Sequence, residues 1–334
     1  MTSLHIAVFA VIAVAMVFDY TNGFHDAANA IATAVSTRAL TPRIALALAA
    51  LGNLAGAFFG EKVAKTVGSG IVTLPTGMAS LGIVFAGVVG AIAWNLITWY
   101  FGLPSSSSHA LIGALLGATL FGSGNVVHWD VMVEKVVVPM IGSPVVGFLL
   151  GGLVMIAFMW LFRHGNPSKL NRGFRIAQRF SALAMAVGHG MQDAAKTMGI
   201  IVLALYTGGM VSNKDHIPTW VFFTSATVLA AGTYAGGWRI IRTLGRKVIH
   251  LGPPEAFAAE TVASIVLYVA AWNKMPISTT HTITSAIMGV GATKKLSAVK
   301  WGVAGNIVTA WVLTIPCAAA IACLVHLAVR PLFH

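Results

Sequence analysis

The chain has 334 residues, of which 57% are hydrophobic and only 9% are charged, and its mean hydropathy is +0.84. A soluble domain carries about 25% charged residues, so this composition excludes a water-soluble globule. It also excludes a disordered chain and a disulfide scaffold, because apolar residues dominate and there are only two cysteines.

Apolar segments of membrane-spanning length follow one another along most of the chain. A transmembrane helix needs about 20 apolar residues, and ten segments offer them between short polar gaps. No Lys or Arg precedes the first segment, so we expect a retained helix rather than a cleaved signal peptide. We expect the long first segment, 4–37, and the long last one, 301–328, to be broken or doubled. The sequence predicts an all-α polytopic membrane protein with about 10–12 membrane segments.

Two shorter segments follow Pro104 and Pro276 and contain about 17 residues each. Proline ends the preceding helix and favours the first turn of a new one. Each proline therefore marks a helical hairpin, which can be re-entrant or cross the membrane fully.

The basic residues are concentrated in four gaps, at 38–43, 163–179, 239–247 and 294–300. These gaps hold 14 of the 21 Lys and Arg residues and no Asp or Glu. Under the positive-inside rule they face the cytoplasm, which places both chain termini on the extracytoplasmic side of the plasma membrane. The net charge of +12 thus needs no nucleic-acid partner, since no aromatic and basic platform accompanies it.

Three motifs occur twice, in the same order. The pairs are NGFHDAAN at 22–29 with HGMQDAAK at 189–196, GxxAG at 52–56 with GxxAG at 232–236, and PSSSSH at 104–109 with PISTTH at 276–281. The gaps after equivalent motifs differ in charge, so the two copies face opposite sides of the membrane. We expect two inverted-topology repeats, 1–162 and 180–334, joined by a short cytoplasmic linker at 163–179.

Both proline motifs place hydroxyl groups at the start of a helix. The hydroxyls belong to Ser105, Ser106, Ser107 and Ser108 in the first copy, and to Ser278, Thr279 and Thr280 in the second. A helix start attracts anions through its free N–H groups and the positive end of its dipole. N-capping is the simpler interpretation, but a serine run matched in both halves favours a phosphate-like site near the membrane midplane.

Asp26 and Asp193 lie within apolar spans, where a charged side chain costs at least ~2.5–3.5 kcal/mol to insert. Beside an anion, a carboxylate is useful only if it holds a cation or a proton. Import of a dianion into a negative interior also needs co-moving positive charge. We expect both Asp residues to bind the coupling cation, with Asn22, Asn29 and Gln192 as further oxygen ligands, and Asn29 to contact the phosphate as well. The alternative for Asp193 is a structural ion pair with Lys196 at i, i+3.

Three other motif residues have two interpretations each. His109 and His281 occupy the same place in the two proline motifs, and they suit either a proton relay or hydrogen-bonded helix packing. Lys196 replaces Asn29 in the second copy, where it can contact the anion or neutralise Asp193. No Gly-x-Ser-x-Gly elbow and no P-loop motif is present, so we expect no catalytic residue, no resident metal and no cofactor.

These motifs resemble the inorganic phosphate transporters of the PiT family. The likeness rests on residues 22–30, on 94–95 with 100–109, on 189–199 and on 276–281. It implies about twelve segments in two inverted repeats, with broken helices and two helical hairpins around one phosphate. It also implies symport with protons, often of a metal–phosphate complex, or with sodium. By position, Asp26, Asn29 and Asp193 match the signature polar residues, and the hairpin hydroxyls match the phosphate-binding ones.

The second signature departs from the family pattern at two positions. Gln192 and Ala195 stand where the family usually has Asn and Gln, and the lost amide favours protons over sodium near Asp193.

We expect a secondary active transporter that imports inorganic phosphate by cation symport and alternating access, with arsenate as a competitor. Alternatives are symport of another oxyanion such as sulfate, or of a metal–phosphate complex. The protein would act in the lipid bilayer, as a single chain or as a homodimer.

Overall fold

The computed structural model describes residues 2–120, 126–214 and 216–333. Within these ranges the chain is almost entirely helical, and its one sheet is a short antiparallel pair, β1 (Val72–Thr73) with β2 (Val126–Val127). The predicted all-α class is confirmed.

The long and short helices follow the same order in both halves. The first half contains α1 (Ser3–Ser36), α2 (Pro42–Ala57), α3 (Glu61–Lys65), η1 (Thr66–Gly70), α4 (Met78–Phe101), α5 (Ser107–Thr119), α6 (Trp129–Val131), η2 (Met132–Val137) and α7 (Val138–Leu161). The second contains α8 (Pro167–Thr207), α9 (Thr219–Ala235), α10 (Trp238–Arg242), η3 (Thr243–Lys247), α11 (Pro253–Trp272), α12 (Thr279–Lys294), η4 (Leu296–Ala298), α13 (Trp301–Val329) and η5 (Arg330–Phe333). This common order agrees with the predicted duplication.

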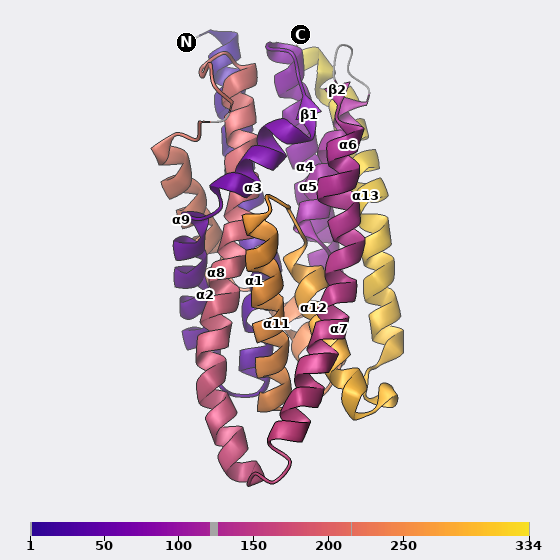
Figure 1. The fold of residues 1–334 in the computed structure, drawn as a ribbon. Coiled ribbons are helices and arrows are strands. Elements are labelled where there is room, and N and C mark those ends of the chain that lie inside the picture. Colours follow the sequence, from indigo (N-terminus) through magenta and orange to yellow (C-terminus); the bar gives the residue numbers. More distant parts are fainter. Residues whose placement is uncertain (1, 121–125, 215, 334) are drawn as a thin grey trace.

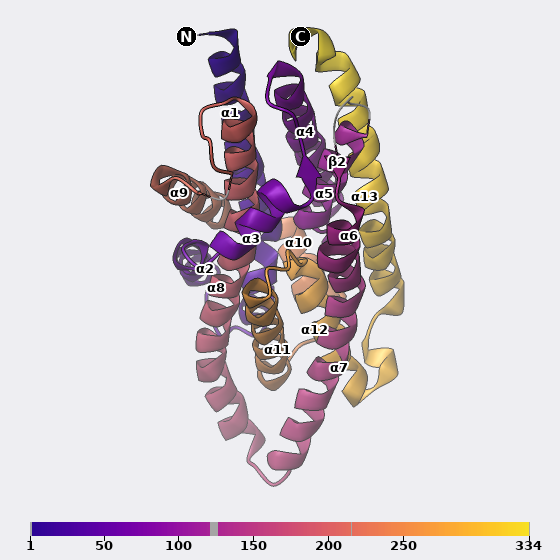
Figure 2. The ribbon, with the colours of Figure 1, turned by 45° about the horizontal axis from the view of Figure 1, so that its top comes forward.

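The two halves interlock rather than lie side by side. Both chain termini are at one end of the bundle, and the connection between α7 and α8 is at the other (Figure 1). Helices α2 and α9 flank one side and α7 and α13 the other (Figure 2). The main contacts between the halves come in equivalent pairs, since α2 packs on α8 as α9 packs on α1, and α7 packs on α12 as α13 packs on α5. Such reciprocal packing is typical of inverted repeats.

Five helical segments of the described residues are long and apolar enough to cross a membrane. They are Ser3–Ser36, Met78–Phe101, Trp129–Leu161, Pro253–Trp272 and Trp301–Phe333. A sixth span is available if α2 and the following helix count as one, and these two are bent by 67° at their junction. A bend of this kind occurs in a broken span or in a re-entrant loop, and the whole arrangement is that of a multi-pass membrane protein.

The second helix of each predicted hairpin is short and lies inside the bundle. Helix α5 has 13 residues and α12 has 16, which correspond to about 20 Å and 24 Å, less than the ~30 Å hydrocarbon core. Every residue of α5 is buried, and α12 is buried from Thr279 to Gly291. This length and burial favour the re-entrant form of the hairpins α4–α5 and α11–α12.

Left-handed backbone at each hairpin break lets the chain turn sharply. Helix α4 ends at Gly102, whose φ is +67°, and Lys274 after α11 has a φ of +60°. Pro104 and Pro276 follow within two residues and prevent either helix from continuing. The breaks thus lie where the proline motifs predicted them.

Two expectations about helix boundaries were wrong. Helices α1 and α13 are each continuous, over 34 and 29 residues, because α1 contains no proline and Pro316 is accommodated inside α13. Helix α8 begins at Pro167, capped by Asn166, so most of the segment 163–179 is helical. Its basic residues extend the helix beyond the apolar core, a continuation that apolarity alone does not reveal.

Candidate functional site

The two short helices α5 and α12 begin at equivalent serines. Ser106 Oγ accepts a hydrogen bond from the backbone N–H of His109 at 3.2 Å, and Ser278 Oγ accepts one from that of His281 at 3.1 Å. Two of the predicted phosphate-binding hydroxyls thus serve as N-caps in this structure. The hydroxyls of Ser107, Ser108, Thr279 and Thr280 follow in the first turns.

These two helix starts meet in the interior of the bundle. The Ser108 hydroxyl donates to the carbonyl of Ile277 at 3.3 Å, which links the first hairpin to the break of the second. The rings of His109 and His281 contact each other edge to face, with 4.7 Å between their centroids. Two positive helix ends therefore point at one small region, an arrangement that favours an anion.

Asp26 lies directly beside the first hairpin. Its Oδ2 accepts a hydrogen bond from Ser107 Oγ at 2.7 Å, and its Oδ1 lies 2.6 Å from Nδ1 of the neighbouring His25. The other ring nitrogen of His25 lies 3.0 Å from the Thr98 hydroxyl, which accepts from Ser105 at 2.8 Å. A continuous chain of polar groups thus connects the first proline motif to this carboxylate.

Asp193 is paired with two basic groups of its own helix. Its Oδ1 is bound by the Lys196 ammonium, and its Oδ2 lies 2.9 Å from Nε2 of His189. His189 in turn donates from Nδ1 to the Asn53 side-chain carbonyl at 3.0 Å. The predicted i, i+3 ion pair with Lys196 is present, and His189 at i, i−4 adds a second partner.

The two carboxylates approach each other closely enough to share a cation. One ligand atom each from Asp26, His189 and Asp193 lies within 4.8 Å of the other two, and all three residues are buried. Carboxylate oxygen and imidazole nitrogen can bind a proton or a metal cation. We call Asp26, His189 and Asp193 the central cluster.

Asn29 connects the central helix α1 to the second hairpin. Its side-chain amide donates to Thr279 Oγ1 at 3.1 Å and to Thr280 Oγ1 at 2.9 Å. Gln192 donates its amide to the carbonyls of Leu267 and Met275, and both atoms of the Asn22 amide lack a hydrogen-bond partner among the described residues. The predicted roles of these residues stay predictions.

His109 and His281 are packed among rings. His281 stacks on Trp311 with 4.0 Å between centroids. No hydrogen bond joins either histidine to Asp26 or Asp193 in the part of the chain that the structure describes. This environment favours the packing interpretation over a proton relay through these two rings.

Comparison with known proteins agrees with this geometry. Residues 22–322 match the model of the phosphate transporter family. The chain is 48% identical over 319 residues to a probable low-affinity inorganic phosphate transporter of Rhizobium meliloti, with 95% of each chain covered. It is 41% identical over 322 residues to a protein of the same description from Bacillus subtilis, with 96% of each covered. The chain belongs to the phosphate transporter family.

The fold of this family member is shared with a solved structure. That structure is described as the sodium-dependent phosphate transporter, and it matches with a TM-score of 0.89 at 22% identity, covering 97% of this chain and 99% of the other. The family match and the two relatives confirm the resemblance to the PiT family, and they indicate transport rather than catalysis.

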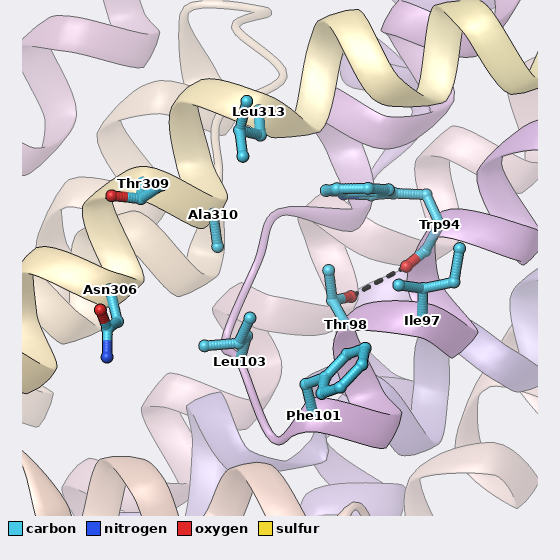
Figure 3. A pocket seen from close by; sticks show the side chains of 9 residues that line it. All are labelled: Trp94, Ile97, Thr98, Phe101, Leu103, Asn306, Thr309, Ala310 and Leu313. Atoms are coloured by element: carbon cyan, nitrogen blue, oxygen red, sulfur yellow. Dashed lines mark hydrogen bonds between the residues drawn. The ribbon is translucent and has the colours of Figure 1, made fainter.

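The transporter also has a cavity of about 490 Å³ beside the first hairpin break. Figure 3 shows it between the end of α4, Leu103 in the break, and the α13 residues Asn306, Thr309, Ala310 and Leu313. Of the polar chain that leads to Asp26, only Thr98 lines it. None of the predicted phosphate-binding side chains lines this cavity.

Three residues of this transporter escaped the sequence-based prediction. Thr98 sits in α4 with no motif to mark it, and His189 is marked only by the repeated Asp motif. Asp19, a fully buried acid on α1, lies outside every repeated motif. The criterion that selected Asp26, a charge within an apolar span, would have found Asp19 as well.

Proposed function

We propose that this chain imports inorganic phosphate across the plasma membrane by symport with a cation, through alternating access. Membership of the phosphate transporter family supports phosphate as the substrate. The observation that carries the proposal is the meeting of two hydroxyl-bearing helix starts, from opposite repeats, beside the central cluster. A site of this kind attracts an oxyanion and a cation together.

Phosphate would lie between the first turns of α5 and α12. The hydroxyls of Ser107, Ser108, Thr279 and Thr280 offer hydrogen bonds, as does the Asn29 amide that already reaches the second hairpin. The buried Lys196 ammonium, which is paired with Asp193, supplies positive charge. Because Asp26 and Asp193 repel the anion, a proton or sodium ion at the central cluster is needed when phosphate binds.

The inverted repeats provide the two conformations that alternating access requires. The side chains of the site are buried here, and the α7–α8 connection, with its basic flank, lies at the end of the bundle opposite to the termini (Figure 1). We place this basic end in the cytoplasm and both termini outside. If the equivalent helices of the two repeats exchanged their packing arrangements, the site would open to the opposite side of the membrane.

Uptake by purified protein in liposomes tests the proposal. Radiolabelled phosphate should accumulate against its gradient when a proton or sodium gradient is imposed, and the two gradients are applied separately to identify the ion. Asp26→Asn should abolish accumulation, whereas Asp130→Asn, at an exposed position of α6, should leave it unchanged. Arsenate should compete and sulfate should not. Equal competition by sulfate would contradict phosphate specificity, and passive equilibration without accumulation would contradict symport.

A metal–phosphate complex is a second candidate substrate. It is favoured by the central cluster, because two carboxylates and an imidazole within 4.8 Å of one another can bind a divalent ion. Phosphate uptake would then depend on added Mg²⁺, and labelled divalent ion would enter together with phosphate. Uptake that persists in the presence of a chelator would exclude this substrate.

A further inference from the structure

The break of each hairpin is bound by a short helix from the other half of the chain. The Thr66 hydroxyl, at the start of η1, donates a hydrogen bond of 3.0 Å to the backbone carbonyl of Lys274 in the break of α11–α12. The Thr243 hydroxyl, at the start of η3, donates one of 2.8 Å to the carbonyl of Gly102 in the break of α4–α5. Both carbonyls belong to the residue with left-handed backbone at which the hairpin turns.

A cation and an aromatic ring accompany each of these hydrogen bonds. The Lys62 ammonium lies over the Trp272 ring, 4.2 Å from its centroid, and the Arg239 guanidinium lies over the Tyr100 ring at 4.7 Å. Such contacts are attractive. In both halves the cation precedes its threonine by four residues, and the ring precedes the bonded carbonyl by two. The two contacts are therefore equivalent. We call the contact made by Lys62 and Thr66 the outer latch, and that made by Arg239 and Thr243 the inner latch.

The two latches lie on opposite sides of the membrane in the orientation proposed above. The inner latch belongs to the basic segment 239–247, which we place in the cytoplasm. Helix α3, which carries Lys62, crosses the end of α11 that lies nearer the chain termini (Figure 1). The outer latch thus holds α11–α12 near the extracytoplasmic side, and the inner latch holds α4–α5 near the cytoplasm.

Each latch is also fixed to the central helix of the half whose hairpin it holds. A Cβ atom at Gly68 in η1 would lie 2.6 Å from the backbone oxygen of Gly199 in α8, and one at the equivalent Gly245 in η3 would lie 2.8 Å from that of Ala32 in α1. Helices α8 and α1 carry the acids of the central cluster. The segments η1 and η3 therefore connect each hairpin break to the helix that bears one of these acids.

We propose that Thr66 and Thr243 are positioning residues that hold the two hairpins closed over the phosphate site, and that release of the outer or the inner latch opens the site to the corresponding side. This inference rests on the proposed function. Ser107 follows Gly102 by five residues, as Thr279 follows its own bonded carbonyl, so movement of a break moves a helix start. Both latches are formed here, and the side chains of the site are buried.

The alternative is that the threonines only satisfy two buried carbonyls. The carbonyls at the end of a helix have no partner within that helix and need one inside a membrane. A purely structural bond of this kind requires no counterpart in the other half. Inverted repeats exchange their conformations during transport, so a contact that controls access has to occur in both halves with the same geometry. The matching cations and rings favour this second role.

The two latches differ in strength. In the inner latch the threonine is buried, and Arg239 also lies over the Trp99 ring at 5.2 Å and donates to the Tyr100 carbonyl at 2.5 Å. In the outer latch the threonine is half-buried, and Lys274 adopts a left-handed backbone that is unfavourable for a residue with a Cβ atom. The outer latch should therefore open more readily, which exposes the site to the side from which an importer takes up phosphate.

Sided labelling of a buried thiol tests the proposal without any measurement of transport. The native Cys317 and Cys323 are replaced by alanine, Ser108→Cys places a thiol between the two hairpins, and a membrane-impermeant maleimide is applied to vesicles of either orientation. Loss of one hydrogen bond shifts such an equilibrium by about threefold or more. We expect Thr66→Val to raise the labelling rate by this factor from the extracytoplasmic side only, and Thr243→Val from the cytoplasmic side only.

Conservative and matched variants separate a latch from a structural hydrogen bond. Thr66→Ser and Thr243→Ser keep the hydroxyl and should restore the original labelling rates. Thr207→Val is the matched control, because Thr207 is buried on α8 and its hydroxyl donates within that helix. It should change neither rate. A valine variant of either latch that raises labelling equally from both sides, or from neither, would overturn the proposal.

Cross-linking covers the case in which a valine variant does not fold. Lys62→Cys with Trp272→Cys places two thiols at the outer latch, and Arg239→Cys with Tyr100→Cys places two at the inner latch, all at exposed positions. A short bifunctional methanethiosulfonate should lower phosphate uptake by about tenfold in either pair, because a closed gate stops the cycle. A reductant should restore uptake, and the single variants should not respond to the reagent. Uptake that persists in the cross-linked protein would refute the latches.

The latches and the proposed function can fail separately. Labelling of the buried thiol needs no phosphate, so absence of phosphate uptake by the wild type would refute the proposed function, and the labelling rates would still decide the latches. Normal phosphate uptake with unchanged labelling in both valine variants would refute the latches and leave the proposed function standing.

Discussion

Asn53 and Thr233 occupy equivalent positions in the two repeats, and the Asn53 amide donates a hydrogen bond of 2.7 Å to the Thr233 hydroxyl. His109 and His281, another equivalent pair, also contact each other. Equivalent residues can meet only near a pseudo-twofold axis. The axis therefore runs through the interior of the bundle, close to the central cluster, and relates the two hairpins that flank it.

Loss of the Asn53 side chain should weaken both the repeat interface and the orientation of His189. Asn53→Ala removes the bond to Thr233 and the acceptor of His189 Nδ1, and each buried bond contributes about 1 kcal/mol. We expect a lower midpoint of thermal unfolding for the purified protein and slower phosphate exchange. Thr224→Val, which removes an exposed hydroxyl bonded within α9, should change neither quantity.

A methyl group at Gly190 should force α2 and α8 apart. A Cβ atom there would lie 2.3 Å from the backbone oxygen of Asn53, and at the equivalent Gly23 it would lie 2.5 Å from that of Leu229. Backbone atoms cannot yield as a flexible side chain does, so both alanine variants should lose roughly 1–3 kcal/mol or more of stability. Gly142→Ala meets nothing within 4 Å and should fold normally. Normal thermal stability of Gly190→Ala would show that this close packing is dispensable.

Removal of the Asn29 amide should weaken phosphate binding more than protein folding. Asn29→Ala loses both hydrogen bonds to the second hairpin, and the proposed anion loses one donor. At about 1–1.5 kcal/mol for such a bond, the phosphate concentration for half-maximal uptake should rise about tenfold. Thr207→Val again serves as the buried control. An unchanged value would remove Asn29 from the phosphate site.

Variants of the Lys196–Asp193 pair should affect the stability of the protein and its phosphate transport differently. Lys196→Met leaves the buried Asp193 carboxylate with His189 as its remaining basic partner, and loss of one member of a buried pair typically costs about 3–5 kcal/mol. The double variant Asp193→Asn with Lys196→Met should recover most of this stability but not uphill phosphate uptake. Recovery of both would show that the pair is structural only, as the alternative interpretation of Asp193 holds.

Local signals in the sequence were sufficient for the class of the protein, its duplication and its two hairpins. Apolarity over about 20 residues, Pro104 and Pro276, and the recurrence of the Asp motif each act within a short stretch of chain. Where these signals predict a wrong helix boundary, packing against neighbouring helices determines the boundary instead. Helix α1 is continuous through Gly23, and α9 packs directly on that glycine.

The site required the tertiary structure. Nothing local indicates that Ser107 bonds to Asp26 or that Asn29 reaches across to Thr279. These relationships join residues up to 250 positions apart. The sequence by itself determined which polar residues enter the membrane, because the composition of each segment and the spacing of the motifs indicate them. Only the packing of the two inverted halves decided which of them meet, because partners in a low-dielectric interior are set by helix contacts rather than by order along the chain.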